Sequence, residues 1–282
     1  MQIIIPMTGQ GSRFKAAGYD TYKPLIKILG KPVIAYLVSM FDEEDSIHII
    51  LREDLMQDEE VVNYLQNLHP NMHIHACPAH KKGPVYTVAQ CYGILSKTES
   101  ILVTYCDYYM HWDYKKFKQK VNAIAIDGAI PCYTSFHPHL LHPENVYASC
   151  KVDEFMNLLE IKEKHVYHED KKQDYHSAGA YYFKNREILV NYFHNLMTNG
   201  PDLNGEFYVS LVYNQMVKDG LCVWVDDNVS HFCQWGTPKD MEESVLWLDK
   251  VRDNQMPENV DEQRIFAYWK QFYLQEQLNA HS

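Results

Sequence analysis

The residues best suited to chemistry lie within the first thirty positions of the chain. Gly9 and Gly11 directly follow an apolar, β-branched run at residues 2–7, and Arg13 and Lys23 come shortly after them. A short apolar run bounded by glycine is typical of a buried strand that ends in a loop, where open α/β sheets place their ligands. Glycines let the backbone N–H groups face outward, and cationic side chains match phosphate oxygens. The stretch therefore predicts a loop that binds a nucleoside triphosphate (NTP).

This loop differs from two common phosphate-binding motifs. The Gly-x4-Gly-Lys-Ser/Thr pattern of a Walker loop is absent, and no third glycine follows Gly11 at the spacing of a dinucleotide site. A Gly-x-Gly pair by itself more often only makes a turn. The prediction therefore depends on Arg13 and Lys23 at their spacing after the strand.

A second anchor is Asp107, which ends the apolar run at residues 101–105. In a parallel sheet this carboxylate should emerge at the same edge as the first loop. An alternative interpretation is a helix N-cap, for which aspartate is a preferred residue. Beside a phosphate-binding loop, a Mg²⁺ ligand is the interpretation we favour.

Composition excludes several classes of protein. The chain has 282 residues, 46% of them hydrophobic, and a formal net charge of −11, so a sizeable core is expected and a nucleic-acid or polybasic membrane contact is not. The apolar start is too short for a signal peptide, and no run approaches the roughly 20 apolar residues of a membrane span. These features predict a cytoplasmic protein with a small-molecule ligand.

The cysteines and histidines do not form a recognisable framework. Seven cysteines are scattered without a Cys-x-x-Cys pair, which predicts reduced and mostly buried thiols. The fifteen histidines include His73 and His75 in an alternating stretch, but they lack acidic partners at metal-ligand spacing. We therefore predict no metal site built on histidine.

Hydrophobic periodicity predicts alternating strands and helices, the pattern of a parallel sheet with crossover helices. Strands are expected at 2–7, 46–51, 72–76, 99–105, 128–133, 146–152, 156–161, 177–183 and 222–225, with a short strand pair within 25–32. Helices are expected at 33–41 and 59–68, after Gly83, from 204–209 onward, and at 241–251 and 263–278.

The last two expected helices carry a stripe of aromatic residues that includes Phe266, Trp269 and Phe272. Such a stripe is usually core or a dimer contact rather than a cofactor site, so a homodimer stays open. Repeats and Gly/Ser-rich linkers are absent from the sequence. We predict a domain at 1–240 and a C-terminal helical extension at 241–282.

The first loop resembles the signature of the nucleotidyltransferase (NTP:sugar-phosphate or phospho-alcohol pyrophosphorylase) family. The match consists of the strand followed by Gly9, Gly11, Ser12, Arg13 and Phe14, with Lys23-Pro24 ten residues on. The resemblance covers roughly residues 1–240. It implies a Rossmann-like, glycosyltransferase-A type α/β fold with a mixed, mostly parallel sheet, and transfer of a nucleotide from an NTP with Mg²⁺ and release of pyrophosphate. Arg13 and Lys23 are then the catalytic residues. The implied nucleotide-binding residues are Pro6, Met7, Thr8, Gly9, Gly11, Ser12, Gly83 and Thr87.

Later motifs resemble the family more weakly. Lys164 matches a lysine that contacts the acceptor's phosphate, with Lys162 as a competitor, and Gly179 matches a strand glycine that the acceptor approaches. Glu206 matches a glutamate near the acceptor, although a first-turn glutamate also stabilises a helix N-terminus by itself. Gly83 is equally compatible with an ordinary junction between a loop and a helix.

The chain departs from the family pattern at Gln234, where relatives place an aspartate as the second Mg²⁺ ligand. An amide oxygen ligates Mg²⁺ more weakly than a carboxylate, and water or the triphosphate can complete the coordination. Asp226 or Asp227 is another source of the missing carboxylate.

The form of the first loop resembles cytidylyl- and uridylyltransferases, so we favour CTP over UTP. The resemblance implies a phosphorylated small molecule as the acceptor, such as a sugar phosphate, phosphocholine or phosphoglutamine, and a role in surface or capsular polysaccharide synthesis. Two other classes stay open. A nucleotide-sugar-dependent glycosyltransferase would carry a D-x-D motif that the stretch at Asp107 lacks, and Gln234 is compatible with a catalytically disabled NTP-binding regulatory protein.

Overall fold

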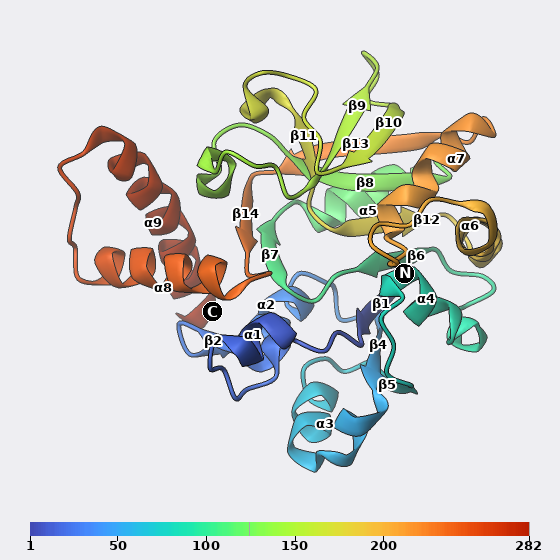
Figure 1. Ribbon diagram of the computed structural model, residues 1–282, viewed down its shortest axis with the longest axis horizontal. Helices are drawn as coiled ribbons and strands as arrows, with labels where there is room; N and C mark the ends of the chain where they lie inside the picture. The colour runs from blue at the N-terminus through green and yellow to red at the C-terminus, as the bar shows by residue number, and fades with distance from the viewer. Residues whose placement is uncertain (124, 282) are drawn as a thin grey trace.

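A computed structural model of the chain describes residues 1–123 and 125–281, apart from the side chains of residues 280 and 281. Its main sheet has the strand order β10-β9-β11-β8-β12-β6-β1-β4-β5, and β13 pairs with β8. Helices lie on both faces of this sheet, as Figure 1 shows. The described helices are α1 Ser12–Ala16, α2 Val33–Val38, α3 Glu59–Gln66, α4 Gly83–Ala89, α5 Tyr114–Ala123, α6 Arg186–Asn199, α7 Val212–Lys218, α8 Pro238–Arg252 and α9 Val260–His281.

The first half of the sheet is parallel. Its strands are β1 (Gln2–Met7), β4 (Ser46–Arg52), β5 (Met72–Cys77) and β6 (Ile101–Thr104), and β1 lies between β4 and β6. All four end at one edge, because parallel strands share their direction. This edge receives the first loop and Asp107, as the sequence predicted.

The second half of the sheet is largely antiparallel, since β12 runs against both β6 and β8 while β13 runs parallel to β8. Two smaller antiparallel pairs, β2–β3 and β7–β14, stand apart from it. The remaining strands are β2 Lys27–Ile28, β3 Lys31–Pro32, β7 Tyr108–His111, β8 Gly128–Tyr133, β9 Ala148–Val152, β10 Leu158–Glu163, β11 Tyr175–Ser177, β12 Ala180–Phe183, β13 Val223–Val229 and β14 His231–Gln234. The mixed α/β sheet flanked by helices confirms the predicted fold class.

The continuous apolar character of β1 follows from burial on both faces. Ile3 and Ile5 point into one core with residues of α2, α3 and α5, and Ile4 points into the core on the opposite face with residues of α4 and α6. All three are fully buried. Successive side chains of a strand alternate between faces, so a strand with a helix layer on each side must be apolar throughout.

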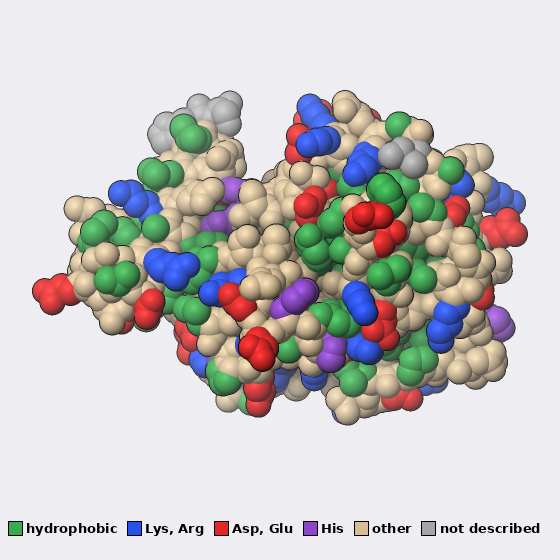
Figure 2. Space-filling view, turned by 90° about the horizontal axis from the view of Figure 1, so that it is seen from above, with side chains coloured by type: hydrophobic (Ala, Val, Ile, Leu, Met, Phe, Trp, Pro, Cys, Tyr) green, Lys and Arg blue, Asp and Glu red, His purple; other side chains and the backbone are tan. Residues whose placement is uncertain are grey.

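The C-terminal helices α8 and α9 build a third core. Phe266 and Phe272 of α9 pack with Phe14, Tyr36 and Trp235 and are 1% and 0% exposed. Figure 1 shows both helices together at one end of the molecule, beside β7 and β14, and Figure 2 shows the surface notched between this end and the rest. The aromatic stripe therefore belongs to the core, whereas a homodimer and the division at residue 240 stay predictions.

Two expected elements are different in the structure. The strand predicted at 177–183 is interrupted at Gly179, whose φ of +86° breaks the extended backbone between β11 and β12. Residues 204–209 do not open a helix, because Leu203 and Glu206 close a turn with mutual backbone hydrogen bonds of 2.9 and 3.1 Å. Helical backbone begins at Val209, in a 3-10 turn that leads into α7 at Val212, so Glu206 does not lie in a first helical turn.

The sequence analysis missed four elements: helices α5 and α6 and strands β7 and β14. Strand β7 follows directly after Asp107. Its partner β14 lies more than a hundred residues later, so its pairing is a long-range choice that local patterns do not reveal. The seven cysteines are free, and four of them are buried.

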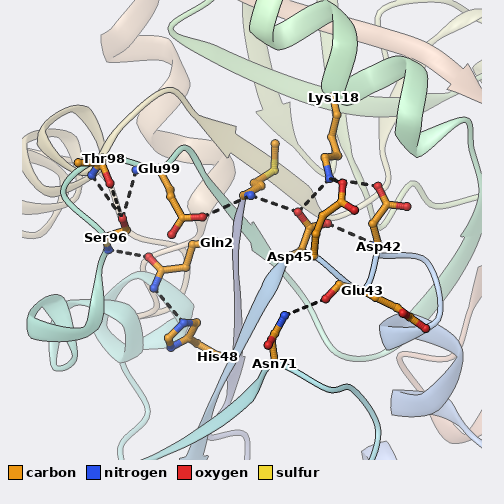
Figure 3. Close-up of polar contacts among 12 residues, drawn as sticks. Gln2, Asp42, Glu43, Asp45, His48, Asn71, Ser96, Thr98, Glu99 and Lys118 are labelled. Atoms are coloured by element: carbon orange, nitrogen blue, oxygen red, sulfur yellow. Dashed lines mark hydrogen bonds and ion pairs between the residues drawn. The ribbon is translucent and has the colours of Figure 1, made fainter.

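The amino-terminal edge of the sheet is held by a buried charge network around Asp45, drawn in Figure 3. Asp45 is fully buried and accepts hydrogen bonds from Lys118 of α5 at 3.1 Å, from Tyr114 at 2.7 Å and from the Met1 amine at 3.1 Å. Burial raises the pKa of Asp45, but these hydrogen bonds outweigh it and hold the pKa below its ordinary value. A buried carboxylate needs such partners, and here they attach α5 to the sheet.

None of the described helices is long and apolar enough to cross a membrane. Within residues 1–123 and 125–281, no group of three or more His, Cys, Asp or Glu side chains has the arrangement of a metal site.

Acid should destabilise the fold through His48, which is 9% exposed and stacks on His73 and His75. Burial, with the charges of those two rings, lowers the pKa of His48 to about 4. An unfolded histidine titrates near pH 6.5, so stability is complete above that pH and is lost as the pH falls towards 4, by up to about 1.4 kcal/mol per pH unit.

Urea unfolding between pH 7.5 and 4.5 measures this effect. We expect His48→Gln to show a flatter dependence of the free energy of unfolding on pH than the wild type. His194→Gln, at an exposed position of α6, serves as the control and should leave the dependence unchanged. Equal slopes in the wild type and His48→Gln would show that His48 does not contribute.

Candidate functional site

The first loop leaves β1 at Met7 and enters the short helix α1 through Gly11, which has the left-handed values φ +63° and ψ +26°. Glycine suits this position because it has no Cβ to clash. Phe14 of α1 is 2% exposed and packs into the third core, whereas Arg13 beside it is exposed. The loop is thus anchored by its aromatic residue and presents its arginine outward.

The carbonyl groups of this loop are bound from behind by two side chains that the sequence analysis did not single out. The Tyr22 hydroxyl donates to the Met7 carbonyl at 2.5 Å, and Arg52 Nη1 donates to the Gly9 carbonyl at 3.1 Å. Arg52 is 7% exposed and pairs through Nε and Nη2 with the Asp54 carboxylate. Because the carbonyls are held on this side, the loop's amide groups are left for a ligand on the other side.

The centre of the site is Lys23, which lies in the 3-10 turn Lys23–Leu25. Its ammonium donates to Asp107 Oδ2 at 2.7 Å and to the Gly236 carbonyl at 2.9 Å. The Lys23 side chain is 15% exposed and that of Asp107 is 30% exposed, so both reach the surface. The structure therefore brings together two of the residues that the sequence predicted for catalysis and metal binding.

Gln234 ends β14 next to this pair. Strand β14 pairs with β7 in a register that puts Gln234 opposite Tyr108, and the following amide, of Trp235, donates to the Asp107 carbonyl at 3.0 Å. The Gln234 amide nitrogen donates to Asp240 Oδ2 at 2.7 Å. Asp240 was missed in the sequence, although the Thr-x-x-Asp spacing of a capping box would have pointed to it.

The two alternative carboxylates lie elsewhere. Asp226 is 1% exposed on β13, where Asn228 donates to it at 2.5 Å, and Asp227 beside it is exposed. Asp240 is instead the second carboxylate next to Asp107: a methyl group placed on Gly236 would lie 3.5 Å from Asp107 Oδ2 and 3.8 Å from Asp240 Oδ2.

Thr8 and Thr87 form one wall of the site. Their hydroxyl groups are hydrogen-bonded at 2.7 Å, and the Thr87 hydroxyl also contacts His80 Nε2 at 3.0 Å. Because His80 Nδ1 accepts from the Lys82 amide at 3.1 Å, the neutral ring carries its proton on Nε2 and donates to Thr87. His80 is a further residue that the sequence analysis did not connect to the site.

Gly83 has a specific structural requirement at the start of α4. Its φ is +83°, and a Cβ there would lie 2.8 Å from both the backbone nitrogen and the backbone oxygen of Phe207. The Lys82 carbonyl and the Val85 amide bond to this same Phe207 backbone at 3.0 and 3.2 Å. Only glycine permits this approach, and it brings Glu206, whose Cβ would lie 3.1 Å from a Cβ on Gly83, next to the start of α4.

Two opposite charges, those of Glu206 and Arg13, act on the Tyr208 hydroxyl. Burial and the Glu206 carboxylate raise the pKa of Tyr208 to about 12, whereas the Arg13 charge lowers it. The pKa of Tyr208 thus responds to both charges, and Arg13 forms no ion pair within the described part of the chain.

The remaining predicted acceptor residues are placed around β10 and β12. Lys164 follows β10 with a φ of +52° and an exposed side chain, whereas its competitor Lys162 is paired with Glu160 at 2.9 Å. Lys164 is thus the lysine left available for an acceptor. Gly179 lies against Tyr105, whose ring would be 3.1 Å from a Cβ at that position.

Glu163 ends β10 directly before Lys164. It accepts a hydrogen bond from Ser210, and burial raises the pKa of the Glu163 carboxyl above its ordinary value. This carboxyl lies near Tyr105, whose own pKa is raised by burial and in part by the Glu163 charge.

A family model described as nucleotidyl transferase matches residues 2–223 of the chain. The chain belongs to the nucleotidyl transferase family. The resemblance seen in the first loop is thereby confirmed, and nucleotidyltransferase activity is the chemistry that this family performs.

Known relatives agree with this assignment. A 185-residue stretch, 65% of the chain, is 25% identical to the bifunctional protein GlmU of Methanocaldococcus jannaschii and spans 40% of that protein's length. The fold is similar to a nucleoside-diphosphate-sugar pyrophosphorylase from Vibrio cholerae RC9, with a TM-score of 0.71 and 19% identity over 86% of this chain and 99% of that one. An inositol-1-phosphate CTP transferase from T. maritima has a TM-score of 0.64 and 14% identity, covering 95% of this chain and 96% of that one. At these identities the structural likenesses show the fold alone.

Loss of the Arg52 contact should weaken NTP binding in this nucleotidyl transferase. Arg52→Met removes the donor to the Gly9 carbonyl, so the loop is less well held, and we expect an affinity about tenfold lower, the equivalent of one charge-assisted hydrogen bond. Calorimetric titration with CTP and UTP measures this affinity. Asp54→Asn keeps the bond to Gly9 and is the matched control. Unchanged binding in Arg52→Met would contradict the role of Arg52 in positioning the loop.

Proposed function

We propose that this protein transfers a nucleoside monophosphate, CMP by preference, from an NTP to a phosphorylated small acceptor and releases pyrophosphate. The observation that carries the proposal is the Lys23 ammonium, held between Asp107 and the Gly236 carbonyl beside the glycine loop. A cation, a carboxylate and outward-facing amides in one place suit a triphosphate and the metal that accompanies it.

In this reaction a phosphate oxygen of the acceptor attacks the α-phosphorus of the NTP in line. The new oxygen–phosphorus bond forms as the bond to the bridging α–β oxygen breaks, and pyrophosphate leaves with that electron pair. No proton has to move, so catalysis consists of positioning and charge neutralisation. Lys23 holds the α-phosphate and the attacking oxygen, and Arg13 stabilises the charge that develops on pyrophosphate.

The donor set at this end of the site fits Mg²⁺. Asp107 offers a carboxylate, and Gln234 Oε1 is buried without a hydrogen-bond partner in the described part of the protein, as expected for an oxygen that meets a ligand. Mg²⁺ prefers oxygen ligands and uses few from the protein. Asp107 and Gln234 would hold the ion, which when bound neutralises charge on the α-phosphate.

The choice of substrates depends on the first loop and on the shared fold. The form of the first loop favours CTP, with UTP as the alternative, and the fold shared with an inositol-1-phosphate CTP transferase supports this choice. Gly83 and Thr87 would contact the nucleobase and ribose. Lys164, Gly179 and Glu206 line the acceptor side, where a sugar phosphate, phosphocholine or phosphoglutamine would bind for the synthesis of a surface or capsular polysaccharide.

A panel assay tests this function. Pyrophosphate release is measured for CTP, UTP, GTP, ATP and dTTP in turn, with Mg²⁺ and a set of sugar phosphates, phosphocholine and phosphoglutamine. We expect release with one pyrimidine nucleotide and one acceptor. NTP binding without release for any acceptor would favour the alternative that Gln234 marks an NTP-binding protein without transferase activity.

Single substitutions test the assigned roles. Arg13→Ala and Lys23→Ala should each lower kcat by about two to three orders of magnitude, because each removes a charge that acts on the transition state. Lys15→Ala and Lys27→Ala, at exposed positions near the same segment, are the controls and should keep their turnover. Near-normal turnover in Arg13→Ala and Lys23→Ala, in variants that melt like the wild type, would refute the assignment.

A further inference from the structure

The orientation of the Gln234 side chain is determined by Asp240. An ionised carboxylate only accepts hydrogen bonds, so the group 2.7 Å from Asp240 Oδ2 must be the amide nitrogen of Gln234. The amide oxygen then faces away from Asp240. This oxygen is buried and has no hydrogen-bond partner among the described residues. A buried acceptor without a partner is unfavourable, and a bound ligand would remove that cost.

Asp240 is itself rigidly held. Its Oδ2 also accepts from the Thr237 amide at 2.7 Å and from the Thr237 hydroxyl at 2.6 Å, while the Asp240 amide donates back to that hydroxyl at 3.2 Å. This capping box opens the 15-residue helix α8, which packs into the third core through Met241 and Leu248. Asp240 is therefore a fixed hydrogen-bond acceptor at the start of α8, beside Gln234.

We propose that Asp240 is a positioning residue that holds the Gln234 amide with its oxygen towards the metal of the NTP complex. The inference rests on the proposed function, because it concerns the metal site of that reaction. Gln234 then supplies a neutral ligand in place of a carboxylate, and Asp240 supplies the missing negative charge one hydrogen bond further away.

The consequence is a site that binds the free ion weakly. Of the two proposed ligands, only Asp107 is a carboxylate, and it forms an ion pair with Lys23. The metal should therefore enter together with the triphosphate, whose oxygens complete its coordination.

Asp240 also has a purely structural role as a capping residue, so the test must separate the two roles. Thr237→Ala removes the hydroxyl of the capping box but keeps the bond between Asp240 and Gln234. Asp240→Ala removes both. Both variants lose stability through the weakened cap, but only Asp240→Ala frees the amide of Gln234.

The experiment measures Mn²⁺ binding by electron paramagnetic resonance, with and without CTP and in the absence of an acceptor. Gln234→Met, which lacks the oxygen, and Asp240→Ala should each weaken Mn²⁺ binding in the presence of CTP by about tenfold, as expected for a ligand and for its orienting partner. Thr237→Ala should stay within about twofold of the wild type. Equal Mn²⁺ binding in Asp240→Ala and Thr237→Ala would overturn the inference.

A double variant provides a rescue. In Gln234→Glu combined with Asp240→Asn, the direction of the hydrogen bond is reversed and a carboxylate faces the metal. We expect this variant to bind Mn²⁺ more tightly than the wild type, even without CTP. Binding no tighter than in Asp240→Ala would also count against the proposal.

The measurements distinguish a failure of this inference from a failure of the proposed function. If the wild type releases pyrophosphate while Asp240→Ala and Thr237→Ala bind Mn²⁺ equally, the function stands and the inference fails. If no acceptor supports release while Mn²⁺ binding still depends on Gln234 and Asp240, the transfer reaction fails and the inference stands.

Discussion

The ion pair between Lys23 and Asp107 is the interaction on which the site depends. It joins residues 84 positions apart, and the same ammonium reaches the Gly236 carbonyl, 213 positions away. A largely buried ammonium is unfavourable unless it is paired, so these segments must converge for the chain to fold with Lys23 in place. In the proposed reaction the α-phosphate would share this ammonium, which would release the carboxylate towards the metal.

The C-terminal helices support this arrangement from outside the matched family region. Phe14 of the first loop and Trp235, next to Gln234, both pack into the core that α8 and α9 complete. Trp235 is fully buried, and its indole nitrogen donates to Ser244 of α8 at 3.2 Å. The helices thus hold both the phosphate loop and the proposed metal ligand, which explains why an aromatic stripe lies so far along the chain.

The two ends of the site differ in their electrostatics. Lys23, Asp107 and Asp240 give one end a dense set of charges, whereas Glu163, at the end proposed for the acceptor, is half-buried and accepts a hydrogen bond from Ser210. In the proposed reaction the charged end would bind the triphosphate and its metal, and the exposed Lys164 would supply the cation for the acceptor's phosphate.

The sequence by itself determined the parts of this protein that depend on neighbouring residues. The strand, the glycine loop and the arrival of Lys23 and Asp107 at the same edge of the sheet were predictable, because buried strands, turns and parallel-strand ends leave local patterns. The family followed from the resemblance of the first loop, and the catalytic and metal-binding roles stay predictions. The single strand expected at 177–183 is divided at Gly179, and the helix expected from residue 204 begins later, because the left-handed Gly179 and the Leu203–Glu206 turn override local propensity.

Only the tertiary structure decided which distant groups meet. The contact of Arg52 with Gly9, the approach of Phe207 to Gly83 and the bond from Lys23 to the Gly236 carbonyl each join segments far apart in the sequence. A hydrogen bond between remote residues depends on the packing of whole helices and strands. Single-residue preferences do not encode that packing, and for this reason the sequence by itself did not reveal these contacts.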